Sequence, residues 1–110
     1  MQRVLVTGAG IVGSHIAQRL VQQGHDVVLL DLDPKLSHIS SIVDVTNINI
    51  VKADVTDASM LATLAEQYQI EGIIHTAVML TGPSQQAPAR SVAVNIGGAV
   101  NVMEPHAAGW

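Results

Sequence analysis

The chain alternates between short apolar runs and segments whose apolar residues recur every three or four positions. The apolar runs predict strands at residues 3–7, 27–31, 49–53 and 72–78. Aliphatic, largely β-branched residues dominate these runs, which is typical of buried parallel strands. The helical spacing predicts one helix after the first strand and another before the fourth, with apolar faces made of Ile11, Ile16, Ala17, Leu20 and Val21 and of Met60, Leu61, Leu64 and Ala65.

Boundary residues support these elements. We expect Gly24 to end the first helix and Asp57 to cap the N-terminus of the helix before the fourth strand. Pro34 is expected to open a short helix or turn that runs to about Val43. Residues 81–88, with the sequence TGPSQQAP, predict a loop. Residues 89–103 predict a last helix, which Pro105 ends or kinks.

Strands that alternate with helices predict an α/β fold, here a Rossmann-like doubly wound parallel sheet. We expect about four strands in the order 3-2-1-4. Such sheets bind ligands beyond the carboxyl ends of their strands, at the point where the strand order reverses. That point lies between the first and the fourth strand. A length of 110 residues favours a single domain over residues 1–110.

Composition excludes several classes of function. The net charge is −4 without a basic cluster, which disfavours nucleic acid and anionic membranes as partners. The chain has no cysteine, so it has no disulfide, thiol catalysis or cysteine-ligated metal, and a cytoplasmic location is expected. The histidines show no metal-ligand spacing, and no apolar run approaches the length of about 18 residues that a membrane span needs.

Gly8, Gly10 and Gly13 form a G-x-G-x-x-G motif between the first strand and the first helix. The first glycine allows a tight turn, the second lets the backbone approach a pyrophosphate, and the third lets the helix pack close to the strand. The start of the helix, at Ile11 and Val12, then offers free N–H groups and a positive dipole end to the phosphates. The motif therefore predicts a dinucleotide site.

Asp31 ends the second strand, 18 residues beyond the last glycine of the motif. Its carboxylate can accept hydrogen bonds from both ribose hydroxyls of an adenosine, and its charge repels a 2′-phosphate. Leu32 and Asp33 follow it, with no arginine, which favours NAD over NADP as the cofactor. The hydroxyls of Thr7 and Ser14 either donate to the phosphates or only satisfy the turn, and the sequence leaves both alternatives open.

Four segments, VLVTGAGIVGSHIAQRL, VKADVTD, IIHTAV and SVAVNIGGAVNVME, occur in this order. Together they resemble the extended short-chain dehydrogenase/reductases, the NAD-dependent epimerase/dehydratase family, over residues 2–104. The β-hydroxyacid dehydrogenases share the opening motif over residues 8–25, but not Thr7, ADVTD or VNIGGAVNV. The chain departs from the family in its turn, because it has one residue fewer between the first two glycines than the usual G-x-x-G-x-x-G.

The resemblance implies further contacts with the cofactor. Asp54 and Val55 correspond to the family's site beside the adenine ring. Ala77, with His75 and Thr76 before it, corresponds to the strand end that lies along the ribose and pyrophosphate of the cofactor. His75 is either such a contact or a packed residue at the end of the strand.

The catalytic part of the resemblance is incomplete. Asn95 corresponds to the asparagine that supports the family's proton relay, but the Tyr-x-x-x-Lys pair that carries the general acid/base has no match. Tyr68 precedes the fourth strand, and Gly72 stands four residues after it. Relative to the family we therefore expect an incomplete domain that is inactive alone. Because its fourth strand is apolar, we expect that strand's edge to favour homo-oligomers.

Three hypotheses remain. The chain is the NAD-binding domain of an epimerase/dehydratase-like protein, or it is a non-catalytic module that binds or senses NAD. In the third hypothesis, a second chain completes an oxidoreductase or epimerase that acts on a sugar-nucleotide-type substrate.

Overall fold

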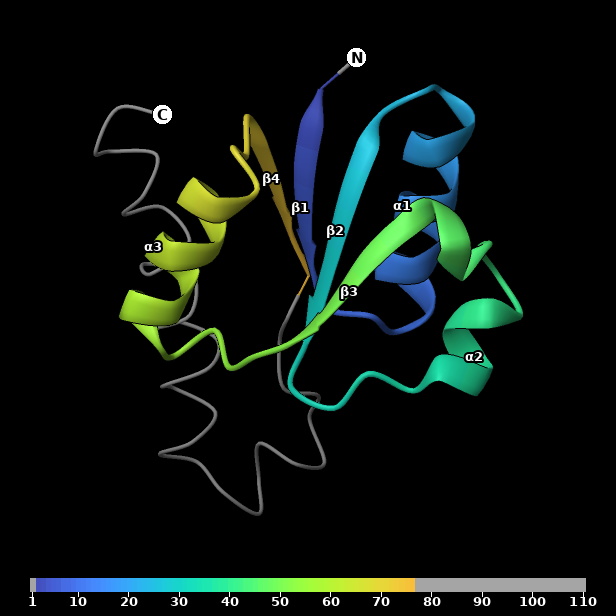
Figure 1. Cartoon of the computed structure of the whole chain (residues 1–110). Coiled ribbons are helices and arrows are strands. Elements are labelled where there is room, and N and C mark those ends of the chain that lie inside the picture. The colour runs from blue at the N-terminus through green and yellow to red at the C-terminus, as the bar shows by residue number, and fades with distance from the viewer. Residues whose placement is uncertain (1, 77–110) are drawn as a thin grey trace.

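The computed structural model describes residues 2–76, which form a parallel four-stranded sheet with helices on both of its faces (Figure 1). The elements, in chain order, are β1 (Arg3–Thr7), α1 (Ile11–Gln22), β2 (Asp26–Asp31), α2 (Leu36–Ser40), the 3-10 helix η1 (Val45–Asn47), β3 (Ile48–Lys52), α3 (Ala58–Gln67) and β4 (Gly72–His75). The strand order is β3-β2-β1-β4, and each neighbouring pair is parallel. The predicted fold class and strand order are confirmed.

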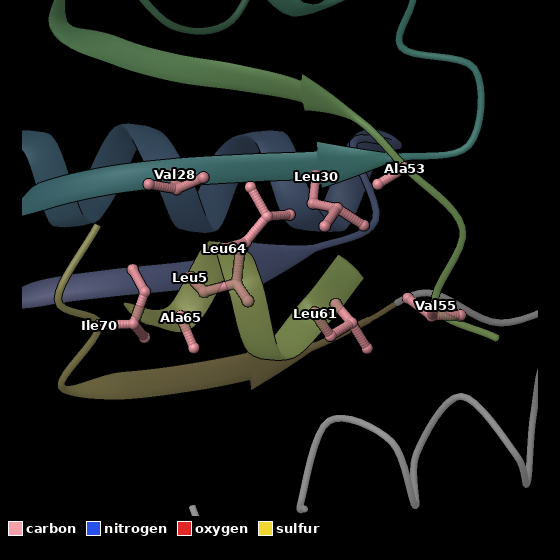
Figure 2. Packing of buried hydrophobic residues seen from close by; sticks show 9 residues of the cluster. All are labelled: Leu5, Val28, Leu30, Ala53, Val55, Leu61, Leu64, Ala65 and Ile70. Atoms are coloured by element: carbon pink, nitrogen blue, oxygen red, sulfur yellow. The ribbon is translucent and has the colours of Figure 1, made fainter. Parts of the chain in front are cut away.

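Alternation along the strands gives the sheet two apolar faces, because successive side chains point to opposite sides. The register places Leu5 beside Val28 and Val6 beside Leu29. The face under α1 and α2 buries Val4, Val6, Ala9, Ala17, Val27, Leu29, Ile39 and Val43. The face under α3, which we call the α3 core, buries Leu5, Val28, Leu30, Ala53, Val55, Leu61, Leu64, Ala65 and Ile70 (Figure 2). Figure 1 shows α1 and α2 on one side of the sheet and α3 on the other.

Two helix boundaries lie where local signals predict them. Gly24 has a φ of +85°, and its N–H donates to the carbonyl oxygen of Val21 at 3.0 Å, which ends α1. An Asp57 carboxylate oxygen accepts a hydrogen bond from the Met60 N–H at 3.0 Å and caps α3. The side chain of Met60 is nevertheless exposed, so its predicted place in the apolar face of this helix is wrong.

Other boundaries differ slightly from the predicted ones. The second strand begins one residue earlier, since the N–H of Asp26 donates to the carbonyl oxygen of Gln2 at 2.9 Å and extends the pairing with β1. The third strand is shifted one residue towards the N-terminus. After Pro34 only a five-residue helix forms, anchored by the fully buried Ile39. The predicted loop at 81–88 and the predicted helix at 89–103 lie outside the described residues.

Candidate functional site

The turn between β1 and α1 lies at the carboxyl end of the sheet, the end where all four strands finish. Gly8 has a φ of +93°, and its N–H donates to the carbonyl oxygen of Leu30 at 2.6 Å. A Cβ added to Gly13 would lie 1.7 Å from the carbonyl oxygen of Gly8, so α1 approaches the end of β1 too closely for any other residue. A Cβ added to Gly10 would meet nothing within 4 Å. The turn is therefore tightly packed at Gly13, whereas the position of a Cβ at Gly10 is open.

The first turn of α1 faces this open space. Gly10 is the N-cap and carries no capping side chain, and the first turn holds no acidic residue. The first N–H groups of a helix have no acceptor within the helix. Ile11 and Val12, which begin the helix, have exposed side chains. Backbone donors and the positive end of the helix dipole thus meet at a point that suits a phosphate group.

The carboxylate of Asp31 is hydrogen-bonded directly to the glycine turn. Its Oδ2 accepts a hydrogen bond from the Ala9 N–H at 2.7 Å, and its Oδ1 accepts one from the Asp33 N–H at 2.9 Å. Each carboxylate oxygen has two lone pairs, so both oxygens can accept a further hydrogen bond. The structure therefore places the acceptor predicted for ribose hydroxyls next to the predicted phosphate-binding turn.

Three charged residues accompany Asp31, and the sequence predicted no role for the two lysines among them. The Lys35 Nζ lies 2.6 Å from the Asp33 Oδ2, and both side chains are exposed. The hydrogen bond and charge of Lys35 lower the pKa of Asp33, and the same contact raises the pKa of Lys35. Lys52 is the register partner of Asp31 across β2 and β3. The sequence signal for the pair of Asp33 and Lys35 is the D-P-K run around Pro34, which brings two opposite charges to one short loop.

The hydroxyls of Thr7 and Ser14 are fully buried and have protein partners. The Thr7 Oγ1 lies 2.6 Å from the His75 Nδ1 and accepts a hydrogen bond from the Thr76 N–H at 3.2 Å. The Ser14 hydroxyl donates to the carbonyl oxygen of Ala9 at 3.1 Å. Both hydroxyls therefore satisfy groups of the turn and the strand ends, and their contact with phosphates stays a prediction. These hydroxyls hold the backbone of the site in place.

His75 and Thr76 join the end of β4 to the end of β1. The Thr76 hydroxyl donates to the carbonyl oxygen of Thr7 at 2.5 Å. The direction of the hydrogen bond between the Thr7 Oγ1 and the His75 Nδ1 depends on the histidine tautomer, which also decides whether the ring Nε2 carries a proton. This Nε2 is buried and has no hydrogen-bond partner among the described residues, and burial lowers the pKa of His75.

The segment after β3 reaches the same end of the sheet. The Asp54 Oδ1 accepts hydrogen bonds from the N–H and the hydroxyl of Thr56, at 2.9 and 2.8 Å, which folds this segment into a turn before α3. The side chain of Val55 is part of the α3 core (Figure 2). Ala77 and Asn95, the remaining predicted site residues, lie outside residues 2–76.

A cavity of about 280 Å³ opens at the opposite, amino end of the sheet, lined by Arg3, Asp26, Val27, Val28, Asn47, Asn49 and Tyr68. Tyr68 follows the last residue of α3 and packs, partly buried, against the α3 core. It is thus a packing residue at the end of the sheet away from the glycine turn. Within residues 2–76, no group of three or more His, Cys, Asp or Glu side chains could hold a metal ion, and no helix is long and apolar enough to cross a membrane.

The glycine turn, Asp31 and the joined ends of β1 and β4 all lie within a stretch that matches a known family. Residues 4–107 match the family model described as the NAD dependent epimerase/dehydratase family. The chain belongs to this family. The predicted resemblance is confirmed.

Similar proteins show how far this family relationship extends. The UDP-glucose 4-epimerase of Mycolicibacterium smegmatis is 36% identical over 106 residues, which cover 93% of this chain and 34% of that protein. A 3 beta-hydroxysteroid dehydrogenase/Delta 5→4-isomerase of Mycobacterium tuberculosis is 34% identical over 107 residues, which cover 92% of this chain and 27% of that protein. The chain spans about a third of the length of the first curated relatives that it matches.

A solved structure supports the same relationship. The crystal structure of UDP-glucose-4-epimerase from Stenotrophomonas maltophila, with bound NAD and formylated UDP-arabinopyranose, superposes with a TM-score of 0.84 at 33% sequence identity. The match covers 97% of this chain and 34% of that one. The family fold is therefore shared at the level of three-dimensional structure.

Proposed function

We propose that this chain binds NAD at the carboxyl end of its sheet, as the NAD-binding part of an epimerase/dehydratase-type protein. One observation carries the proposal: the open turn at Gly10 and the carboxylate of Asp31 are joined by the hydrogen bond from the Ala9 N–H. A phosphate-binding backbone and a ribose acceptor thus lie side by side, which is what a dinucleotide requires. The NAD bound in the similar Stenotrophomonas maltophila epimerase supports the choice of cofactor.

The residues present fit the parts of this cofactor. The backbone at Gly10 and the first-turn N–H groups of α1 would hold the pyrophosphate, and Asp31 would hold the adenosine ribose. The exposed side chains of Ile11, Val12 and Leu32 offer apolar surface beside it. When bound, NAD supplies a nicotinamide that can accept or return a hydride. The described residues bind and orient the cofactor, and the buried hydroxyl of Thr7 keeps the strand ends in place.

Catalysis and substrate choice are assigned to residues other than those described. The only tyrosine of the chain, Tyr68, lies at the amino end of the sheet and has no lysine four residues after it. Relatives named for UDP-glucose and for a steroid match this same segment at similar identity. We infer that a sugar-nucleotide-type substrate, if the complete protein takes one, is selected outside this segment, and that these 110 residues alone bind NAD without turning over a substrate.

The variant Asp31→Ala tests the proposal by calorimetric titration with NAD and NADP. The unmodified chain is expected to bind NAD more tightly than NADP. The variant should lose at least about tenfold in NAD affinity, because hydrogen bonds to a charged group are lost, and the preference over NADP should narrow. Asp44→Ala is the matched control, since it removes an equally charged, exposed residue that caps η1. Unchanged NAD affinity in Asp31→Ala would contradict the assignment.

A further inference from the structure

Opposite charges meet at the ribose end of the proposed site. The Asp33 N–H donates to the Asp31 Oδ1 at 2.9 Å, and the Asp33 carboxylate pairs with the Lys35 Nζ at 2.6 Å. Lys52 ends β3 as the register partner of Asp31. Two carboxylates and two ammonium groups therefore occupy one corner of the sheet, and their formal charges cancel. Removing one carboxylate from this set would leave it with a net positive charge.

The ion pair between Asp33 and Lys35 holds one carboxylate and one ammonium group of this corner. A lysine ammonium is a compact point charge that binds phosphate groups, but here Lys35 is already paired. Both partners are charged at neutral pH, and each shifts the pKa of the other further towards its charged form. Both side chains are well exposed, at 65% for Asp33 and 69% for Lys35, so the pair is weak and its members can exchange partners.

We propose that Asp33 is a second specificity-determining residue, which disfavours 2′-phosphorylated cofactors by occupying the Lys35 ammonium. The inference rests on the proposed function, because it concerns the ribose end of the same NAD site. With Asp33 present, a 2′-phosphate at this corner meets two carboxylates and a lysine that is already neutralised. Without it, only Asp31 opposes the phosphate, and Lys35 and Lys52 are both available to attract it.

The variant Asp33→Asn tests this inference with NAD and NADP as the probes. Asparagine keeps the size of the side chain and the backbone N–H that donates to Asp31. We expect NADP affinity to rise about fivefold, the scale of a screened surface ion pair, while NAD affinity changes less than about twofold. The gain should shrink as salt is added, because exposed charges are screened. Asp44→Asn makes the same change in net charge elsewhere and should leave the NADP affinity unchanged.

The double variant with Asp33→Asn and Lys35→Gln isolates the role of the lysine, and it should lose most of the gain in NADP affinity. A gain that persists in the double variant shows that only repulsion was removed, and overturns the role given to Lys35. Unchanged NADP affinity in Asp33→Asn, in a chain that binds NAD, overturns this inference alone. A wild-type chain that binds no NAD overturns the proposed function and this inference with it.

Discussion

The two ends of the sheet are closed by different kinds of contact. At the amino end, an exposed side chain of β1 holds the segment before β4. The Arg3 Nε donates to the Gln69 carbonyl oxygen at 2.9 Å, and the Arg3 guanidinium pairs with Glu71 at 3.4 Å. At the carboxyl end, buried and half-buried groups meet: the Thr7 Oγ1 contacts the His75 Nδ1, and Gly13 packs against the Gly8 carbonyl. Flexible side chains can adjust at the first end. The second end is tightly packed at Gly13, and it leaves the backbone donors of α1 open for a ligand.

The largest expected effect comes from Gly13→Ala. The added Cβ would lie 1.7 Å from the Gly8 carbonyl oxygen and 3.1 Å from the Thr76 hydroxyl, so the turn must open or α1 must move. We expect the free energy of unfolding to fall by at least about 3 kcal/mol, which urea denaturation followed by circular dichroism would measure.

Gly10→Ala is the matched control for that variant. Gly10 has a φ of −77°, which any residue can adopt, and the new Cβ would meet nothing within 4 Å. Its stability should stay within about 0.5 kcal/mol of the wild type, while NAD affinity falls because the Cβ fills the space proposed for the pyrophosphate. Equal stability of the two alanine variants would refute the contrast between the packed and the open side of the turn.

The burial of His75 predicts an intermediate effect, which depends on pH. Burial lowers the pKa of His75 below its usual 6.5, so the unfolded chain takes up this proton first as the pH falls. The contribution of His75 to the free energy of unfolding is fully present above about pH 6.5. It is lost as the pH falls from there to the lowered pKa, and it changes no further below that pKa. The loss is linked to at most one proton, which limits it to about 1.4 kcal/mol per pH unit.

Urea midpoints measured between pH 7.5 and 5 check this window. In His75→Gln the part of the pH dependence that belongs to this group should disappear, whereas a control substitution at the exposed His15 should leave it in place. A wild-type midpoint that stays constant over the window would show that protonation of His75 is not linked to folding.

The smallest effect is expected at the amino end, from Glu71→Gln. The Glu71 Oε1 accepts a hydrogen bond from the Arg3 N–H at 3.1 Å, and a glutamine oxygen can retain that bond while the charge is lost. Because both side chains of the ion pair are exposed, we expect a loss of less than about 0.5 kcal/mol, and NAD affinity should not change. Thermal melts at low and high salt measure the difference, which should vanish at high salt. A loss as large as that of Gly13→Ala would mean that the amino end tolerates a substitution no better than the tightly packed carboxyl end.

The self-association predicted through the edge of β4 stays a prediction. β4 is the outer strand of the four described, and residues 77–110, which follow it, lie outside the described part of the chain. Light scattering of the purified chain over a range of concentrations measures its mass directly, and a constant monomer mass would count against that prediction.

Local sequence predicted most of the fold, because each element carries its own signals. The apolar run before Gly8, the glycine spacing and the strand ending in Asp31 together specify a strand, a turn, a helix and a strand within 31 residues. The cap at Asp57 and the end of α1 at Gly24 are also local signals, and both are confirmed. Strand order followed from the general behaviour of right-handed crossovers, not from any single residue.

The sequence by itself determined which residues form strands and helices, and that glycines and an acid stand where a dinucleotide site has them. Only the tertiary structure decided how their polar groups are used. Thr7 and His75 are 68 residues apart in sequence, and the Ala9 N–H reaches Asp31 across 22 residues. Such contacts form only when parallel strands bring their carboxyl ends together. Their partners therefore follow from packing of the whole sheet, whereas helix and strand positions follow from short-range periodicity.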